Sequence, residues 1–353
     1  MGLELKNITK DWRGFALKNI EVDIKNGDYF IILGPTGAGK TLLLETIMGF
    51  HKPDQGRIFL NGVDITDAPP EKRNIGYVSQ KCVLFPHLNV RQNIEFGLKM
   101  RGTAKAERHK TVNQVLDFTG LKSLEYRLPA TLSGGEKQKV ALARVLATEP
   151  QTIIFDEPLT AIDAETAREL KKELKRIHKS GKTIIHVTHN QIEGFSLGNK
   201  IAVMNSGEIV QTGKPKELFV KPLNKFVARF LGYENIFDAT LIGKQGSVSM
   251  VNVEGVKMKV SESINTTECI IAVRPEDISV SFSPIKNDTV NVLRGTVVEF
   301  ADQGPTVSVT VNAGLSFSVI MTKSAFVEKS LDSGQQVWLS FKSATVKVIE
   351  QKR

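Results

Sequence analysis

The fold of this chain is decided by the stretch GPTGAGKT, which occupies Gly34, Pro35, Thr36, Gly37, Ala38, Gly39, Lys40 and Thr41. It matches the phosphate-loop pattern G-x-x-x-x-G-K-[ST], and it lies between the apolar run YFIIL at Tyr29–Leu33 and the helix-like LLLETIMGF. Glycines let the backbone curl so that successive N–H groups face phosphate oxygens, and a helix N-terminus adds its positive dipole end. We therefore expect these residues to contact a nucleotide, with Lys40 reaching the β- and γ-phosphates and the Thr41 hydroxyl binding Mg²⁺.

The sequence around this loop alternates between apolar β-branched runs and helical stretches. Short runs typical of buried strands in a parallel sheet occur at 152–155 (TIIF) and 183–187 (TIIHV). The amphipathic segment 164–179 predicts a helix that ends at Gly181. This alternation predicts an α/β fold with a parallel-sheet core, namely a P-loop NTPase nucleotide-binding domain over residues 1–230.

A second chemical motif ends the run IIF, where Asp156 and Glu157 lie at the predicted C-terminal edge of the sheet, beside the phosphate loop. We expect Asp156 to hold Mg²⁺, directly or through water, and Glu157 to polarise an attacking water. Three residues are weaker signals: Gln80 could sense the metal or water, His189 could meet the γ-phosphate, and Trp12 could stack an adenine. Taken alone, each of these three is more often structural.

Composition limits the compartment and the partners. With 353 residues, 24% charged and 41% hydrophobic, the chain is ordinary globular protein with room for two or three domains. Its two cysteines, Cys82 and Cys269, make no disulfide framework, so a reducing interior is the simplest compartment. There is no 18-residue apolar run and no secretory leader, so we expect no membrane span. The net charge of +9 falls within residues 1–235, which fits an anionic partner or an ordinary solvated surface about equally well.

After about residue 235 the sequence changes to short alternating segments rich in Val, Ser and Thr, such as VSMVNV, VKMKV and TVSVTV, which predict an all-β domain. Residues 239–260 and 295–320 each contain a strand, a Gly loop, an alternating strand, a Gly turn and another strand. We interpret this as an internal duplication that gives two related OB-like barrel halves, rather than two generic meanders. The second domain is predicted to cover residues 231–353, with an ordered connection at 221–236.

The run LSGGE at residues 132–136 identifies the family that the first domain resembles. The phosphate loop, Gln80, LSGGE, FDEP, the LTAID loop and His189 follow one another as in the nucleotide-binding subunits of ABC transporters, whose signature is usually LSGGQ. The resemblance covers residues 1–230. Glu136 stands where Gln is usual and Ile162 where Leu is common, and these departures are mild. The resemblance implies an active ATPase that uses ATP and Mg²⁺, with Glu136 tuning its rate.

The same resemblance implies a partner copy. Ser133, Gly134 and Gly135 would form a second anion cradle that closes on ATP bound to the opposite subunit. Asp163 would line the interface, so the chain should work as a head-to-tail homodimer. ATP binds the closed dimer better than the open one, and that difference can drive a membrane partner.

Within each subunit, the resemblance assigns roles to the residues around the phosphates. Trp12 would stack the adenine, Glu157 would be the general base, His189 would be the switch residue, and Lys40 would stabilise charge on the γ-phosphoryl group. The implied metal ligands are Thr41, Gln80 and Asp156.

The segment after Gln80 carries Leu84, Phe85, Pro86 and Leu88. In the family this region forms a groove for a coupling helix of a separate transmembrane permease; the alternative is an ordinary core loop. The chain would then lie peripherally on the cytoplasmic face of the cell membrane. A separate ATPase with a β-rich C-terminal domain resembles the importer group for maltose, sulfate, polyamine, iron and molybdate. VRPE at 273–276 matches a motif common in that group.

The end of the chain resembles the small molybdate-binding domains called molbindins, through RGTVV at 294–298, IMTKS at 320–324 and FKSATVKV at 341–348. This implies a molybdate or tungstate importer that bound oxyanion inhibits by holding the ATPases apart. An extracellular oxyanion-binding protein would be an indirect partner, and nucleic acid is not expected. The candidate oxyanion ligands are Thr322, Lys323, Ser324, Lys342 and Ser343, each of which is alternatively a solvated loop residue.

Other functions stay open at this point. A non-transport ATPase of the same superfamily is disfavoured because residues 81–131 hold no long coiled-coil heptads. A pure oxyanion store is disfavoured by the intact Asp156–Glu157 pair, since binding alone needs no general base. Among importers, sulfate, sugar, polyamine and iron remain alternative substrates, with the C-terminal domain serving mainly for dimerisation.

Overall fold

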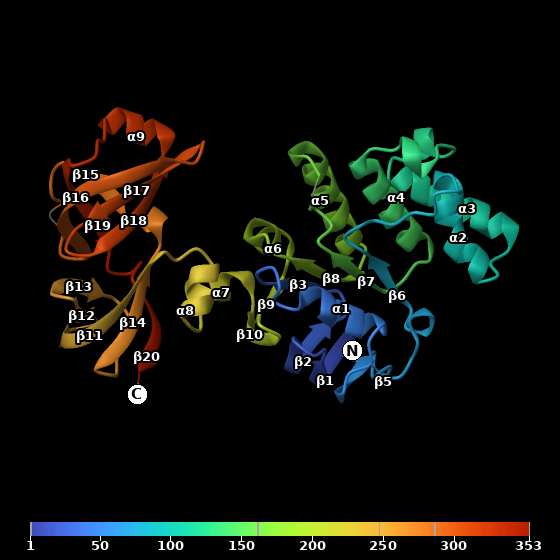
Figure 1. Ribbon diagram of the computed structural model, residues 1–353, viewed down its shortest axis with the longest axis horizontal. Coiled ribbons are helices and arrows are strands. Elements are labelled where there is room, and N and C mark those ends of the chain that lie inside the picture. The colour runs from blue at the N-terminus through green and yellow to red at the C-terminus, as the bar shows by residue number, and fades with distance from the viewer. Residues whose placement is uncertain (1, 161, 247, 286, 353) are drawn as a thin grey trace. The chain divides into compact units, whose positions relative to one another are not determined.

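The computed structural model describes residues 2–160, 162–246, 248–285 and 287–352. The chain forms two compact units, Met1–Pro215 and Lys216–Arg353 (Figure 1). The segment 216–230, which the sequence analysis placed in the first domain, packs with the second unit. A functional boundary at residue 230 stays a prediction.

Unit 1 is built around a six-stranded sheet of order β10-β9-β3-β8-β7-β6, in which only β10 is antiparallel to its neighbour. The strands are β3 (Tyr29–Leu33), β6 (Ile75–Val78), β7 (Thr152–Asp156), β8 (Thr183–Thr188), β9 (Lys200–Asn205) and β10 (Glu208–Gly213). Every residue of β3, β7 and β8 is buried, because both faces of the sheet are covered. The predicted α/β P-loop fold is confirmed.

One face of this sheet is covered by helix α1 (Lys40–Met48) and a second, antiparallel sheet of order β2-β1-β4-β5. Its strands are β1 (Gly2–Asp11), β2 (Ala16–Lys25), β4 (Gln55–Leu60) and β5 (Val63–Asp64). The other face carries α5 (Ala164–Lys179) and α6 (Gln191–Leu197), which contact Tyr29 and Ile31. Helix α5 has its predicted bounds and is followed by Gly181 at φ +87°.

A helical region with its own hydrophobic core lies between β6 and β7 in the sequence (Figure 1). It contains α2 (Val90–Met100), α3 (Lys105–Phe118) and α4 (Gly134–Ala147). Short 3₁₀ turns occur at Pro70–Lys72, Lys122–Leu124 and Pro129–Thr131. Helices α2 and α4 both begin with a capping box, in which Asn89 or Ser133 exchanges hydrogen bonds with the residue three positions later. No helix of the described residues is long and apolar enough to cross a membrane.

Unit 2 begins with two short helices, α7 (Pro215–Val220) and α8 (Lys225–Phe230), and continues with two five-stranded sheets. The first sheet has the order β13-β12-β11-β14-β20 and the second the order β15-β19-β16-β17-β18. The strands are β11 (Asn235–Gln245), β12 (Val248–Val253), β13 (Val256–Val260), β14 (Glu268–Val273), β15 (Ser279–Ser281), β16 (Val290–Asp302), β17 (Thr306–Asn312), β18 (Ser316–Thr322), β19 (Gln336–Lys342) and β20 (Lys347–Lys352). Helix α9 (Lys323–Lys329) follows β18, and a 3₁₀ turn at Pro275–Asp277 follows β14.

The two sheets repeat one pattern, with their last strands exchanged. Strands β11 and β16 are equivalent: each pairs with the next strand through a register shift, after Leu241 or after Val297. Asn235 of β11 pairs with Val273, and Asn291 of β16 pairs with Phe341. The closing strand of each half lies in the other half's sheet, because β20 pairs with β14 and β15 pairs with β19. This confirms the predicted duplication.

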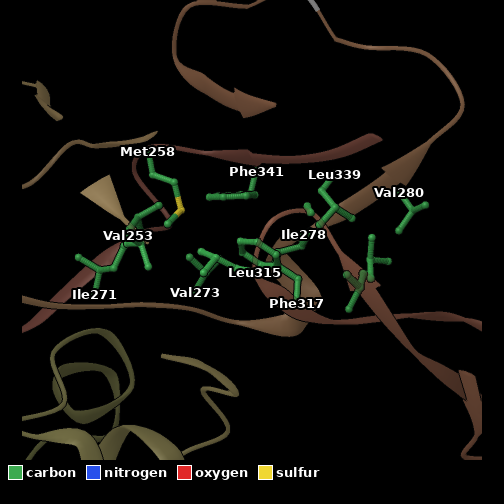
Figure 2. Close-up of a cluster of buried hydrophobic side chains, with 14 of the residues drawn as sticks. Val253, Met258, Ile271, Val273, Ile278, Val280, Leu315, Phe317, Leu339 and Phe341 are labelled. Carbon is green, nitrogen blue, oxygen red and sulfur yellow. The ribbon is translucent and has the colours of Figure 1, made fainter. Parts of the chain in front are cut away.

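The two halves share one hydrophobic core instead of forming separate barrels. Figure 2 shows side chains from both halves in this core, including Val253 and Ile271 from the first and Phe317 and Phe341 from the second. The alternating burial along β12, β17 and β19 supplies these side chains from one face of each sheet. The β domain is therefore a single folded body.

Candidate active site

A hollow of about 480 Å³ lies over the phosphate loop, where β3 ends and α1 begins. The residues that line it are Phe15, Thr36, Gly37, Gly39, Lys40, Thr41, Leu42, Gln80 and Glu157. They come from four separate segments. Three of these segments follow the parallel strands β3, β6 and β7, whose C-terminal ends meet at this edge of the sheet, and Phe15 comes from the turn between β1 and β2 of the antiparallel sheet.

Two glycines of the loop are required by close backbone packing. A Cβ atom on Gly34 would lie 2.3 Å from the carbonyl oxygen of Met204. Gly39 has a φ of +98°, and a Cβ there would lie 2.5 Å from the Phe15 ring. Neither position accepts a larger residue without moving the loop, so the curl that aims the backbone at the hollow is fixed.

The Lys40 side chain lies at the floor of the hollow and is only 6% exposed. Its Nζ donates to the carbonyl oxygens of Gly34 and Pro35, both at 2.9 Å, and lies 4.0 Å from Oε1 of Glu157. Burial lowers the pKa of Lys40, and the carboxylates of Glu157 and Asp156 oppose that shift. The amine is therefore held in place by the loop itself, and it can stabilise an anionic group without reorganising.

Asp156, at the end of β7, faces the hydroxyl groups of Thr41 and Tyr77. The Thr41 hydroxyl donates to Oδ1 at 3.3 Å and the Tyr77 hydroxyl to Oδ2 at 3.4 Å. Asp156 is 3% exposed, and burial raises the pKa of its carboxyl group. A buried carboxylate beside a hydroxyl suits a hard divalent ion such as Mg²⁺.

The described residues contain no group of three His, Cys, Asp or Glu side chains placed to hold a metal ion. A magnesium ion here would therefore take few protein ligands, chosen from Thr41, Asp156 and Gln80. This fits the preference of Mg²⁺ for one or two carboxylates or hydroxyls plus phosphate and water oxygens.

Glu157 is the point at which three of the predicted residues meet. Its Oε1 lies 3.1 Å from Nδ1 of His189, and its Oε2 accepts from Nε2 of Gln80 at 3.4 Å and from the Thr160 hydroxyl at 3.2 Å. Its backbone has a φ of +47°, and its N–H donates to the Val187 carbonyl at 3.0 Å. A glutamate in the left-handed region is uncommon, and the bond to β8 fixes it with its carboxylate at the hollow.

Sequence reasoning missed three residues here: Phe15, Tyr77 and Thr160. Phe15 is the aromatic residue of the hollow's lining. Trp12, the residue predicted to stack an adenine, is half-buried and meets His51 edge-on, with ring centroids 5.3 Å apart. The available signal was the second aromatic residue three positions after Trp12, immediately before β2.

The residues predicted to face a second subunit lie at the start of α4 and α5, and none of them belongs to the described lining of the hollow. Ser133 accepts from the Glu136 N–H at 3.2 Å, and its own N–H donates to the Glu136 carboxylate at 2.7 Å. Glu136, the departure from the usual signature, is therefore used as a helix cap.

The same two helix starts are locked to each other through Thr166. Asp163 caps α5 by accepting from the Thr166 N–H at 2.9 Å and the Thr166 hydroxyl at 2.6 Å. A Cβ on Gly135 would lie 2.4 Å from the Thr166 methyl group. Gly134, the other glycine of the signature, is exposed. Ala161 of the LTAID loop lies outside the described residues.

The loop predicted to meet a permease is pinned by buried Asn93 of α2. The Asn93 side chain accepts from the Phe85 N–H and donates to the carbonyl oxygens of Phe85 and Leu88. Phe85 packs on Phe96 at 4.3 Å between centroids, Leu84 is half-buried, and Pro86 is exposed. Nearby on the same helices, a hollow of about 670 Å³ is lined by Arg91, Glu95, Lys105, Ala106 and His109.

The five candidate oxyanion ligands fall into two sets that the fold separates. Thr322, Lys323 and Ser324 lie at the start of α9, where Thr322 pairs with Thr306 and Lys323 forms an ion pair with Asp302. Lys342 pairs with Val290, at the opposite end of the 13-residue strand β16. At about 3.3 Å per residue, the two sets are too far apart to bind one small ion within one chain.

The two members of the second set differ in exposure. Lys342 is exposed, whereas Ser343 is buried with its Oγ 2.7 Å from Oγ of Ser261. A hydroxyl pair next in sequence to an exposed lysine offers the donor types that an anion site needs.

Comparisons with known proteins match both units of the chain. The model of the family described as ABC transporter matches residues 17–160, and that of the TOBE domain matches residues 271–349. The chain is 42% identical, over 98% of its length and 99% of the relative's, to the molybdate/tungstate import ATP-binding protein of Pyrococcus abyssi. It is 39% identical, over 84% of its length and 83% of the relative's, to the spermidine/putrescine import ATP-binding protein of Thermotoga maritima.

Among solved structures, one similar to this chain is the ATP-binding cassette MJ0796, a dimer in a post-hydrolysis state with bound ADP and phosphate. The two share 31% sequence identity and a TM-score of 0.55, over 60% of this chain and 98% of that one.

Proposed function

The chain belongs to the ABC transporter family as the ATP-binding subunit of an importer, an ATPase that uses ATP and Mg²⁺, and we propose that its substrate is molybdate or tungstate. The observation that carries the substrate is the likeness to the molybdate/tungstate import protein over nearly the whole chain, duplicated β domain included. For hydrolysis, bound Mg²⁺ would polarise the γ-phosphoryl group of ATP. The residues of the hollow would position the water and stabilise the charge that develops on the phosphoryl oxygens.

We assign the chemistry to the residues that meet at Glu157. Its carboxylate orients and deprotonates the attacking water, and Gln80 and Thr160 hold one of its oxygens. His189 contacts the other carboxylate oxygen of Glu157, so it lies beside the position that we assign to the attacking water. Lys40 stabilises negative charge on the phosphoryl oxygens, while Asp156 and Thr41 bind the metal ion. Phe15 and Trp12 are the aromatic candidates for contact with the adenine.

Hydrolysis is proposed to occur in a head-to-tail homodimer. Ser133, Gly134 and Gly135 lie at an exposed helix N-terminus away from the chain's own phosphate loop, so they are free to close on nucleotide held by a second copy. Asp163, which caps the adjoining helix, would lie at the same interface.

The membrane partner would be a separate permease, which places the chain peripherally at the membrane. The hollow between α2 and α3 and the Phe85 loop are the surfaces that we assign to it, because both lie on the helical region. An extracellular oxyanion-binding protein would act on the permease, not on this chain.

The β domain is proposed to bind the imported oxyanion and to inhibit transport. Because Thr322–Ser324 and Lys342–Ser343 lie at opposite ends of β16, we propose that one ion is held between two chains, by one set from each. Bound oxyanion would then stabilise an arrangement in which the nucleotide sites stay apart, which lowers ATP turnover. The functional boundary of this regulatory domain is proposed at residues 230–231.

The test uses the full-length chain reconstituted with its permease. ATP turnover is measured against molybdate, tungstate, sulfate and spermidine added on the nucleotide side. Inhibition by molybdate and tungstate at concentrations well below those of sulfate supports the proposal. A polyamine importer is the second candidate, because the Thermotoga maritima relative is 39% identical. Spermidine uptake, without any effect of molybdate on uptake or ATP turnover, would favour the polyamine importer and overturn the proposal that the substrate is molybdate or tungstate.

A further inference from the structure

The duplication of the β domain places a cation at the same point in each half. Val273 pairs with Asn235, and Phe341 pairs with the equivalent Asn291. The next residue is Arg274 in the first half and Lys342 in the second. Arg274 belongs to the motif VRPE at 273–276, and none of the roles assigned above uses it.

The surroundings of these two cations differ. Lys342 is exposed, whereas Arg274 is only 6% exposed. Its guanidinium carbon lies 3.6 Å from the centroid of the Phe219 ring and 4.3 Å from that of Tyr233. Nη1 lies 3.4 Å from a Glu276 carboxylate oxygen, but Nε and Nη2 have no hydrogen-bond acceptor in the described parts of the chain. Two aromatic faces therefore contact the guanidinium, and the Glu276 and Asp277 carboxylates are the acidic groups that interact with it.

Both rings belong to the segment that leads into the β domain. Phe219 lies on α7, and Tyr233 follows α8. The Tyr233 hydroxyl donates to the Phe219 carbonyl at 3.0 Å, and the Tyr233 N–H donates to the Ala228 carbonyl at 3.0 Å. Ala228 and Tyr233 also share a small hydrophobic core with Ile270 of β14. The guanidinium thus lies where α7, α8 and the end of β14 meet.

We propose that Arg274 is an internal clasp: through its contacts with Phe219 and Tyr233, it holds α7 and α8 on the first half of the β domain. In the second half, the equivalent residue Lys342 is exposed. The clasp makes residues 216–233 part of the β domain.

The test is hydrogen exchange of the full-length chain without nucleotide or oxyanion, followed for peptides from residues 216–233. Arg274→Met keeps the length of the side chain but removes the charge, so these amides should exchange about tenfold faster. Lys342→Met is the matched control, because Lys342 holds the equivalent place and no aromatic ring of the described residues lies over it. This variant should leave exchange in the segment unchanged. Equal acceleration in both variants, or none in Arg274→Met, overturns the clasp.

A second variant keeps the proposal testable if Arg274→Met does not fold. Phe219 is 43% exposed, so Phe219→Leu removes one ring at little risk to the core, and it should accelerate the same peptides severalfold. Unchanged exchange in this variant overturns the proposal. Where both single variants fold, the double variant should exchange no faster than Arg274→Met alone, because both changes remove one interaction. Fully additive acceleration contradicts the clasp.

Discussion

The phosphate hollow of unit 1 and the turn that follows β19 in unit 2 (residues 342–345, the Lys342 turn) both contain hydroxyl and cationic groups suited to an oxyanion, but they are built differently. In the hollow, the Lys40 amine is buried and fixed by two carbonyl oxygens of its own loop. At the turn, Lys342 is exposed, and the candidate ligands Thr322, Lys323 and Ser324 lie at the far end of β16. We therefore predict that the nucleotide site is nearly complete within one chain, whereas the proposed oxyanion site depends on a partner chain.

The strongest test of this contrast is Glu157→Gln. The amide keeps the size of the side chain but cannot accept a proton, so kcat should fall by about 10²–10³-fold while ATP binding is retained. Turnover and nucleotide affinity are measured on the same preparation. Glu21→Gln, on an exposed part of β2, is the control and should change neither. Unchanged turnover in Glu157→Gln would remove Glu157 as the base.

A smaller effect is expected at the second site. Lys342→Met removes the exposed cation, so the molybdate concentration that halves ATP turnover should rise about tenfold. Lys257→Met, an exposed lysine of β13, serves as the control. Mixed dimers sharpen the comparison: one chain with Lys342→Met and one with Ser324→Ala should keep one intact site, whereas chains carrying both changes should keep none. Equal inhibition in all of these dimers would mean that the turn does not bind oxyanion.

The buried Asp156 carboxylate of the hollow is expected to lower the stability of the folded protein, and Asp156→Asn tests this. Burial raises the pKa of Asp156, so the folded state holds its proton more tightly than the unfolded chain. Stability from this group is therefore lost as pH rises through the raised pKa, and the ionised form is unfavourable at pH 7. Removing the charge should raise the Tm of the nucleotide-free protein by about 2–4 °C at pH 7, while Mg²⁺-dependent turnover is lost.

Asp163→Asn is the control for that stability measurement. The hydrogen bonds from Thr166 lower the pKa of the exposed Asp163, so its ionised form is favourable in the folded state. Its amide variant should not raise the Tm. A Tm that falls in Asp156→Asn would contradict the role assigned to burial.

The smallest predicted effect is a difference between the two units in how the Tm changes as the pH falls. All six histidines lie before residue 190, and buried His186 of β8 has a pKa lowered to about 3 by desolvation. Because the unfolded chain binds this proton first, stability is lost as pH falls from 6.5 toward 3. The Tm of unit 1 should drop by about 2 °C between pH 7 and pH 6 from this group, and His186→Gln should remove that part. Calorimetry that finds the same acid response in the variant would contradict it.

Sequence predicted most of the hollow because its signals are local. A phosphate loop, a buried apolar strand and an amphipathic helix each leave their pattern in consecutive residues, and Tyr29–Leu33 and Ala164–Lys179 have their predicted bounds. Phe15, Tyr77 and Thr160 were missed because their parts depend on contacts between distant segments: Thr160 matters only because Glu157 turns back toward it.

In the β domain, the duplication was predicted from the repeated strand pattern, but the exchange of last strands was not. Pairing between β14 and β20 joins residues that lie far apart in the chain, and nothing in the local sequence of either strand specifies it. The same applies to the candidate ligands. Thr322 and Lys342 belong to two motifs of the same resemblance, so the sequence suggests one site. Only the strand register along β16 shows that they lie far apart.

The exchanged strands also affect how the chain is made. The first sheet of the β domain stays open along β14 until β20 has left the ribosome, because no strand of its own half closes that edge. Unit 1 has all its strands by residue 213 and can fold during synthesis. The β domain must wait for its last strand, so a premature stop within residues 347–352 would leave an exposed edge prone to pairing with other chains, beside an already folded ATPase.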